Sequence, residues 1–171
     1  MLTALSVRDV VLIETLDLEF GGGLGVLTGE TGAGKSILLD ALGLALGSRA
    51  DTSLVRAGQA QAAVTATFEV AAGHPARALL ADNDLESEAD EPVIVRRTVR
   101  ADGGSRAFVN DQAVSAGLLR ELGAALVEIH GQQDDRGLLN PRGHRALLDV
   151  FAGADTHAVA QAWRGVEAAQ A

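Results

Sequence analysis

An eight-residue glycine-rich segment constrains the fold more than any other feature of this 171-residue chain. Residues 29–36 read Gly-Glu-Thr-Gly-Ala-Gly-Lys-Ser. A short apolar run at 25–28 precedes the segment, and from 35 to 46 apolar residues recur at helical spacing. Because glycine adopts backbone conformations closed to other residues, this order predicts a buried strand, a tight loop and a helix. Gly47 is expected to end the helix.

The segment matches G-x-x-x-x-G-K-[ST], the pattern of a phosphate-binding loop. In such a loop, backbone N–H groups point at a phosphate, and the positive end of the following helix adds to the attraction. Lys35 would place a compact ammonium between the β- and γ-phosphates, and the Ser36 hydroxyl would bind Mg²⁺. The candidate nucleotide-binding residues are Gly29, Glu30, Thr31, Gly32, Ala33, Gly34, Lys35, Ser36 and Ile37.

Charge and composition narrow the function classes. Lys35 is the only lysine beside 13 arginines, and its ammonium suits a phosphate site better than the rigid guanidinium fork. The formal net charge of −9 disfavours a domain that coats DNA or an anionic membrane by itself. The absence of cysteine excludes a disulfide scaffold and Cys-ligated metal sites. No signal peptide or membrane span is legible, so the sequence predicts a cytoplasmic globular domain.

The rest of the chain alternates between strand and helix patterns. Apolar residues at every second position predict strands at 2–7, 16–20, 62–70, 93–99 and 106–109, with a short apolar run at 10–13. Helical spacing predicts helices at 75–81, 115–122, 142–151 and from 154 onward. A buried strand is expected at 125–129, before the polar loop 130–134. Residues 62–109 are interpreted as an inserted antiparallel unit with an acidic loop at 82–91.

Nucleotide hydrolysis needs more than the glycine loop. A carboxylate at the end of an apolar strand, a water-positioning group and a charge stabiliser must join it. Asp149 and Glu128 are the candidate carboxylates, but Asp149 lies in an expected helix and Glu128 is followed by more strand. The chain is therefore predicted to bind nucleotide without the full hydrolytic set. Two alternatives stay open: a stand-alone P-loop kinase or small NTPase, and an interaction module whose glycine loop is structural.

Several motifs together resemble the N-terminal half of the ATPase head in the RecN family, bacterial DNA-repair members of the SMC-like ABC ATPases. These motifs are the segments at 28–37, 45–51, 54–58 and 105–110, the opening Leu-Ser-Val-Arg-Asp-Val-Val-Leu-Ile-Glu, and Ile-His-Gly-Gln-Gln at 129–133. The resemblance implies an α/β fold: the N-lobe of a P-loop ATPase head, with a mixed sheet around the P-loop helix and an antiparallel β subdomain. The chain departs from the family at Asp9-Val10, where Asn-Phe is usual.

The resemblance also implies ligands, roles and partners. ATP and Mg²⁺ would be the ligands, and Gln132 would meet Mg²⁺ and the attacking water, acting in catalysis together with Lys35. Residues 1–153 would form the lobe, and 154–171 the start of a truncated coiled coil. Hydrolysis would require the chain's own C-terminal lobe and a homodimer of heads. The complete protein would act on DNA in double-strand break repair and recombination, without membrane contact, and would be nucleoid-associated when bound to DNA.

Arginines outside the glycine loop are further candidates. Arg49 and Arg56 follow the P-loop helix. Two roles stay open for each: contact with the nucleotide or with a facing subunit, or an ordinary solvated arginine on a loop. The 93–109 hairpin carries Arg96, Arg97, Arg100 and Arg106, which are able to touch a DNA backbone unless the acidic loop 82–91 neutralises them. His130 and His144 lack metal-ligand spacing.

Overall fold

The structure is a computed structural model that describes residues 1–29, 34–85, 88, 91–129, 148, 151–152, 159 and 161–163. The chain divides into two compact units, Met1–Glu128 and Ile129–Ala171. In the second unit the described residues include one helical hydrogen bond, from the Ala152 amide to the Leu148 carbonyl at 2.9 Å. The helices expected at 142–151 and from 154 onward otherwise lie outside the described residues.

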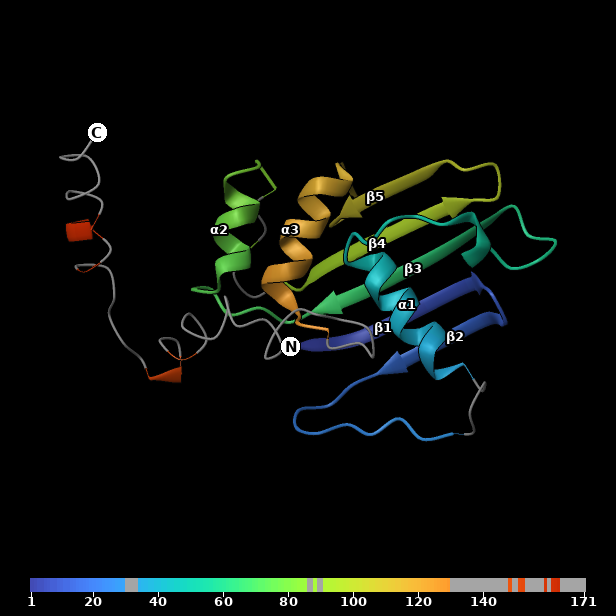
Figure 1. Cartoon of the computed structure of the whole chain (residues 1–171), viewed down its shortest axis with the longest axis horizontal. Helices are drawn as coiled ribbons and strands as arrows, with labels where there is room; N and C mark the ends of the chain where they lie inside the picture. Colours follow the sequence, from blue (N-terminus) through green and yellow to red (C-terminus); the bar gives the residue numbers. More distant parts are fainter. Residues whose placement is uncertain are drawn as a thin grey trace. The chain divides into compact units, whose positions relative to one another are not determined.

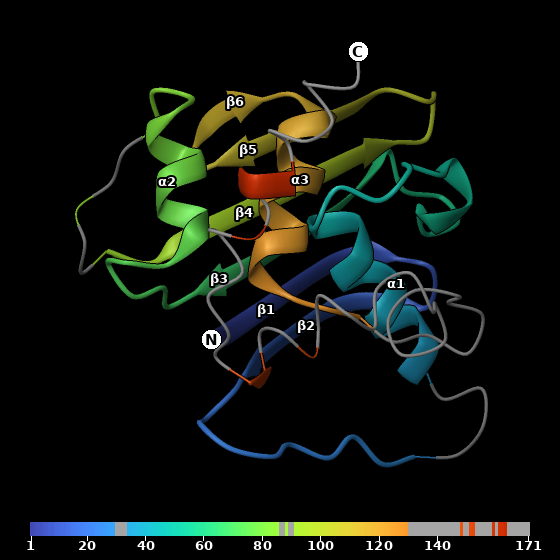
Figure 2. The ribbon, with the colours of Figure 1, turned by 60° about the vertical axis from the view of Figure 1, so that its left-hand side comes forward.

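The first unit is built on an antiparallel sheet of six described strands in the order β2-β1-β3-β4-β5-β6 (Figures 1 and 2). The strands are β1 Leu2–Val10, β2 Ile13–Glu19, β3 Gln61–Phe68, β4 Val93–Arg100, β5 Ser105–Val109 and β6 Gln112–Val114. β3 pairs directly with β1, from Leu2 opposite Phe68 to Arg8 opposite Ala63. The antiparallel pairing expected within residues 62–109 is confirmed, but their interpretation as an inserted unit was wrong, because these strands extend the sheet that β1 and β2 begin.

Three helices cover one face of this sheet (Figures 1 and 2). They are α1 Lys35–Ala45, α2 Pro75–Ala81 and α3 Ala116–Leu126, and a 3₁₀ turn spans Thr52–Leu54. α1 packs against β1, β3 and β4, α3 packs against β5, and α2 packs against α3. The predicted helix at 75–81 is confirmed. It begins at Pro75, after His74 accepts a hydrogen bond from the Ala76 amide at 3.2 Å.

The two faces of the sheet differ in what they bury. We call the face under the helices the closed face and the opposite one the open face. Alternate residues point to each face, so strand register assigns them. The closed face includes Leu5, Val7, Val64, Ala66, Val95, Arg97, Val99, Ala107 and Val109, all of which are buried. The open face includes Ser6, Arg8, Thr65, Arg96, Thr98, Arg106 and Phe108.

Two glycines allow α1 and α3 to meet closely. Gly47 has a φ of +89°, and a Cβ on it would lie 2.5 Å from the Arg120 amide nitrogen. A Cβ on Gly123 would lie 2.5 Å from the Leu46 carbonyl oxygen. Gly47 follows the last turn of α1, as the sequence predicts, because its left-handed conformation turns the chain away from the helix.

Two expected strands are absent from the described structure. Residues 25–28 have no regular structure and are exposed, with Val26 at 75% and Leu27 at 51% exposure. A buried parallel strand needs neighbouring strands and covered faces, and the described residues supply neither to this segment. The second expected strand, at 125–129, is also absent. α3 continues to Leu126, so residues 125–126 are helical and 127–129 are irregular. Buried Leu122 and Gly123 pack this last part of α3 into the core.

Candidate phosphate-binding site

The glycine segment ends at the amino terminus of α1, as predicted. Gly34 occupies the N-cap position with a φ of +92°, a left-handed conformation that glycine adopts without strain. Among the residues that the structure describes, no side chain caps the helix, and its first turn has no acidic residue. The amides of this first turn and the positive end of the helix dipole therefore remain available to an anion.

Lys35 and Ser36 are the first two residues of α1, with Ile37 next to them. The Lys35 ammonium donates a hydrogen bond to the Gly29 carbonyl oxygen, which links the two ends of the glycine segment. Ser36 is exposed, and Ile37 is half-buried. Glu30, Thr31, Gly32, Ala33 and Gln132 lie outside the described residues.

The described part of the site fits a phosphate group. It gathers backbone amides, an ammonium and an exposed hydroxyl within the first turn of one helix. The hydroxyl is also a donor type that Mg²⁺ accepts, usually together with phosphate oxygens and water. Among the described residues there is no group of three or more acidic or histidine side chains that would hold a metal without such help.

Arg56 is held beside the β1–β2 turn. Its Nη1 lies 2.7 Å from the Glu14 carboxylate, and its amide donates to the Asp9 carbonyl at 2.9 Å. Arg49 is exposed after the end of α1. These positions place both arginines on the surface of the first unit, where either is accessible to a second molecule.

The unusual Asp9-Val10 pair fits this turn. Asp9 has a φ of 53°, and aspartate and asparagine are the side chains that best tolerate this left-handed conformation. Val10 is fully buried on the sheet and forms an isolated bridge with Val55. Valine thus fills a core position at the end of β1.

The hairpin arginines divide between the two faces of the sheet. Arg96 lies over the Phe108 ring, 4.5 Å from its centroid, and pairs with Asp111 at 3.0 Å. Arg100 pairs with Asp102 at 2.5 Å. The described carboxylates that pair with these two arginines thus belong to the hairpin region, whereas Glu86 and Asp90 of the loop 82–91 lie outside the described residues.

Arg97 lies on the closed face, only 5% exposed, and Arg106 is exposed on the open face. Arg97 therefore differs from the other hairpin arginines with which its position in sequence grouped it, and its burial was not predicted. The alternation Val93, Val95, Arg97, Val99 was the signal that could have assigned it to the apolar face.

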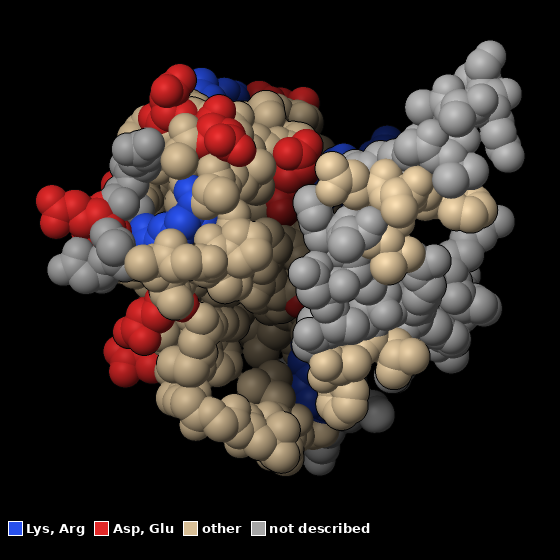
Figure 3. All heavy atoms as spheres, turned by 90° about the vertical axis from the view of Figure 1, so that its left-hand side faces the viewer, with Lys and Arg blue, Asp and Glu red and all other residues tan. Residues whose placement is uncertain are grey.

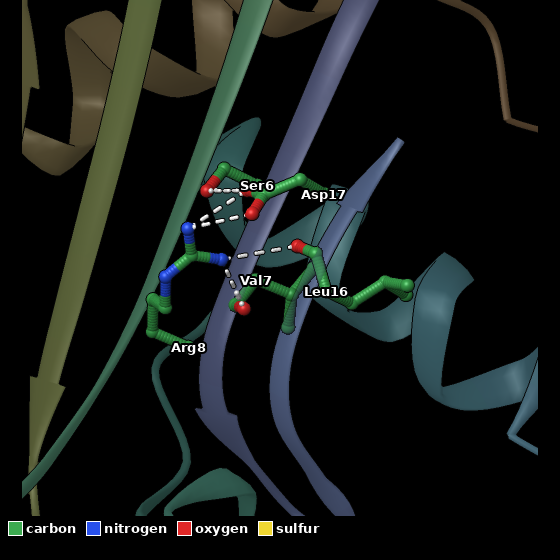
Figure 4. A network of polar contacts seen from close by, with 5 residues as sticks. All are labelled: Ser6, Val7, Arg8, Leu16 and Asp17. Atoms are coloured by element: carbon green, nitrogen blue, oxygen red, sulfur yellow. Dashed lines mark hydrogen bonds and ion pairs between the residues drawn. The ribbon is translucent and has the colours of Figure 1, made fainter. Parts of the chain in front are cut away.

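A paired charge also lies on the open face between β1 and β2 (Figure 4). Arg8 Nη2 contacts the two carboxylate oxygens of Asp17 at 2.8 and 2.9 Å, and Ser6 Oγ donates to the same carboxylate at 2.7 Å. Arg8 Nη1 donates to the Val7 and Leu16 carbonyls at 2.9 and 3.1 Å. The hydrogen bonds from Ser6 and Arg8 hold the pKa of Asp17 below its usual value.

Acidic side chains are scattered over the side of the first unit where α2 lies, with few basic ones among them (Figure 3). Asp82, Asp84 and Glu88 follow α2 there. Such a surface repels a polyanion, in keeping with the net charge of −9.

The two candidate carboxylates do not complete a catalytic site in the described structure. Glu128 is exposed just after α3, in an irregular segment and not in the strand that was expected. Asp149 lies outside the described residues.

A family profile described as "AAA domain" matches residues 4–136 of the chain. The chain therefore belongs to the AAA domain family. Within that family it is a RecN-like sequence: it is 44% identical to the DNA repair protein RecN of Xylella fastidiosa over 91% of the chain, and 40% identical to that of Bacillus subtilis over 96%. The chain spans about 28% of the length of each of these two relatives.

Solved structures support the ATPase-head fold. A structure from a study of ATP-driven dimerization of SMC ATPases matches with a TM-score of 0.60 at 21% identity, over 86% of this chain and 97% of that one. The Smc head domain from Pyrococcus furiosus matches with a TM-score of 0.58 at 21% identity, over 72% of this chain and 32% of that one. RecF with ATP matches with a TM-score of 0.51 at 18% identity, over 67% of this chain and 27% of that one. Among the described helices, none has the length and apolar character to cross a membrane.

Proposed function

We propose that this chain is the ATP-binding N-terminal lobe of a RecN-like ATPase head that acts in DNA double-strand break repair and recombination. The observation that carries the proposal is the start of α1: an uncapped helix, Gly34 in a left-handed conformation, and Lys35 and Ser36 in the first turn. The SMC and RecF structures whose published descriptions name ATP support ATP as the nucleotide, and the RecN relatives support a role in DNA repair.

The residues 29–37 would hold the nucleotide. The amides of the first helical turn would bind a phosphate, and Lys35 would exchange the Gly29 carbonyl for phosphate oxygens. The Ser36 hydroxyl would complete the coordination of Mg²⁺, which supplies charge neutralisation between the phosphates when it is bound. Gln132 would orient the attacking water, with the role that the family resemblance gives it.

The exposed apolar segment before the loop supports the idea of a partial head. Leu24, Val26 and Leu27 are more than half exposed, and so is Leu39 on α1. Exposed apolar side chains grouped in this way are typical of a surface that another polypeptide covers. In this proposal residues 1–153 form the lobe, 154–171 begin a coiled coil, and the protein's own C-terminal lobe covers Leu24–Leu27 and completes the ATPase.

The complete protein would then work as a homodimer. Two heads would enclose ATP between them, with Arg49 or Arg56 in reach of the facing head, and hydrolysis would release the pair. DNA would bind to the assembled protein more than to this acidic lobe, because a net charge of −9 opposes phosphate contacts. Such a protein would be cytoplasmic and would join the nucleoid when bound to DNA.

Nucleotide binding by the 171-residue chain tests the core of the proposal. Calorimetric titration with ATP and Mg²⁺ should show binding that Lys35→Ala weakens by at least about tenfold, because a charge-assisted phosphate contact is lost. Arg100→Gln is the matched control: it removes an arginine that pairs with Asp102 on the hairpin and should leave affinity unchanged. Equal affinity of the wild type and Lys35→Ala would refute ATP binding at this site.

Hydrolysis separates the proposal from its alternatives. Turnover should require the addition of the C-terminal polypeptide, and Val26→Asp should weaken that association by placing a charge on the apolar segment. Turnover by the chain alone, lost in Glu128→Gln or Asp149→Asn, would instead indicate a stand-alone kinase or NTPase. A melting temperature indifferent to ATP and Mg²⁺ would indicate an interaction module.

A further inference from the structure

Arg97 is the one charged side chain among the described residues that is buried. It stands in the centre of β4, between Val95 and Val99 on the closed face, and is 5% exposed. Arginine is almost never fully buried unless it is paired, because removal of its charge from water costs several kcal/mol. A position that places arginine in an apolar row therefore needs a physical reason.

The protein itself does not neutralise this charge within the described residues. Arg97 Nη2 donates to the Ser105 hydroxyl at 3.0 Å, and Nε is buried with no hydrogen-bond partner. The charge that acts on Arg97 from α3 is Arg120, which has the same sign. Burial lowers the pKa of the Arg97 guanidinium, and Arg120 lowers it further. Both effects favour an added negative charge beside Arg97.

A pocket lies against this guanidinium. Its volume is about 420 Å³, and its lining includes Arg97, Ser105, Ala107, Phe108, Val114 and Ala116. Ala116 is the first residue of α3, whose amino terminus is capped by the Ser115 hydroxyl, which accepts a hydrogen bond from the Leu118 amide at 3.0 Å. The pocket therefore combines a buried cation and a hydroxyl with the small apolar side chains of Ala107, Val114 and Ala116, and it has room for more than a single ion.

We propose that this pocket binds an oxyanion, the carboxylate or phosphate group of a small ligand or of an inserted side chain, on Arg97 and Ser105. The planar guanidinium offers parallel N–H donors that match two oxygens of such a group. The Ser105 hydroxyl accepts from Arg97 and keeps its own proton to donate to the ligand.

The site is separate from the glycine loop, and the test keeps the two apart. All variants carry Lys35→Ala, so that phosphate binding at α1 is weakened. Inorganic phosphate and acetate are titrated separately into the 171-residue chain, and the amide shifts of Ser105, Ala107 and Val114 are followed by NMR together with the melting temperature. Arg97→Met keeps the length and the apolar contacts of the side chain, and Arg100→Met is the matched control on the opposite face of the same strand.

Saturable shifts of the three amides with phosphate or with acetate are expected, and Arg97→Met should lower that affinity about tenfold or more while Arg100→Met leaves it unchanged. A stronger response to phosphate would identify a phosphate ligand, and a stronger response to acetate a carboxylate. Shifts that survive Arg97→Met, or no saturable shift with either anion in a folded chain, would overturn the proposal. A folded Arg97→Met spectrum without anion shows that a loss of binding is not a loss of structure.

Discussion

The open and closed faces of the sheet carry their charges in different ways. On the open face Arg8 and Arg96 each lie in contact with an aspartate and remain partly in water. On the closed face Arg97 is buried and has a serine hydroxyl as its described hydrogen-bond acceptor. Exposed pairs contribute between zero and about 1 kcal/mol, whereas an uncompensated buried charge costs several kcal/mol. The exposed pairs of the open face therefore add little to stability, whereas the buried charge of Arg97 on the closed face destabilises the chain unless an anion binds it.

The largest expected effect is on the packing above the closed face. Gly123→Ala should destabilise the chain by about 2 kcal/mol, because the new Cβ would lie 2.5 Å from the Leu46 carbonyl and 2.9 Å from the Leu46 Cβ. Chemical denaturation measures the change. Gly117→Ala is the control in the same helix: its Cβ would meet Ser115 Oγ at 3.6 Å, so it should stabilise α3 by up to about 1 kcal/mol. Equal stability of the two variants would show that α1 and α3 do not pack as described.

Local patterns predicted most of this closed face and its helices. Alternating residues gave the strands at β1, β3 and β4, and Pro75 after His74 marked the start of α2. These features depend on residues close in sequence, so they can be predicted without knowledge of the tertiary structure. The glycine segment was also placed correctly before α1, because glycine, lysine and serine at fixed spacing have one common use.

The features that were predicted wrongly or not at all are two strands and one ion pair, which depend on residues distant in the sequence. Residues 25–28 read as a strand because they are apolar, but a strand needs hydrogen-bonding neighbours, and the described residues offer none. Residues 125–126 read as strand because Ala-Leu-Val is a short apolar run, which periodicity does not distinguish from the end of a buried helix. The pairing of Arg96 with Asp111 depends on the β5–β6 turn and was not legible in either segment alone.

The second-largest expected effect is the change in the free energy of unfolding when the buried charge of Arg97 is removed. In buffer without phosphate or carboxylate, Arg97→Met should raise the free energy of unfolding by about 1 kcal/mol, because an apolar side chain of similar length replaces a desolvated cation. Arg8→Met on the open face should lower it by less than about 1 kcal/mol, since it removes an exposed pair. Urea denaturation of both variants measures the difference. A strong destabilisation by Arg97→Met would mean that the arginine supports the fold and would remove the contrast between the faces.

The smallest effect concerns the pH dependence of the open face. The pKa of Asp17 is lowered in the folded chain, first by the Ser6 hydrogen bond and then by Arg8. A carboxylate with a lowered pKa stabilises the fold above its unfolded pKa, near 3.9, and loses that contribution as the pH falls through its folded pKa. The melting temperature of the wild type should therefore converge on that of Asp17→Asn as the pH falls below about 4. Ser6→Ala should move this convergence to a higher pH, because it removes the larger cause of the lowered pKa. A difference in melting temperature that stays constant from pH 6 to pH 2 would show that the charge of Asp17 does not stabilise the open face.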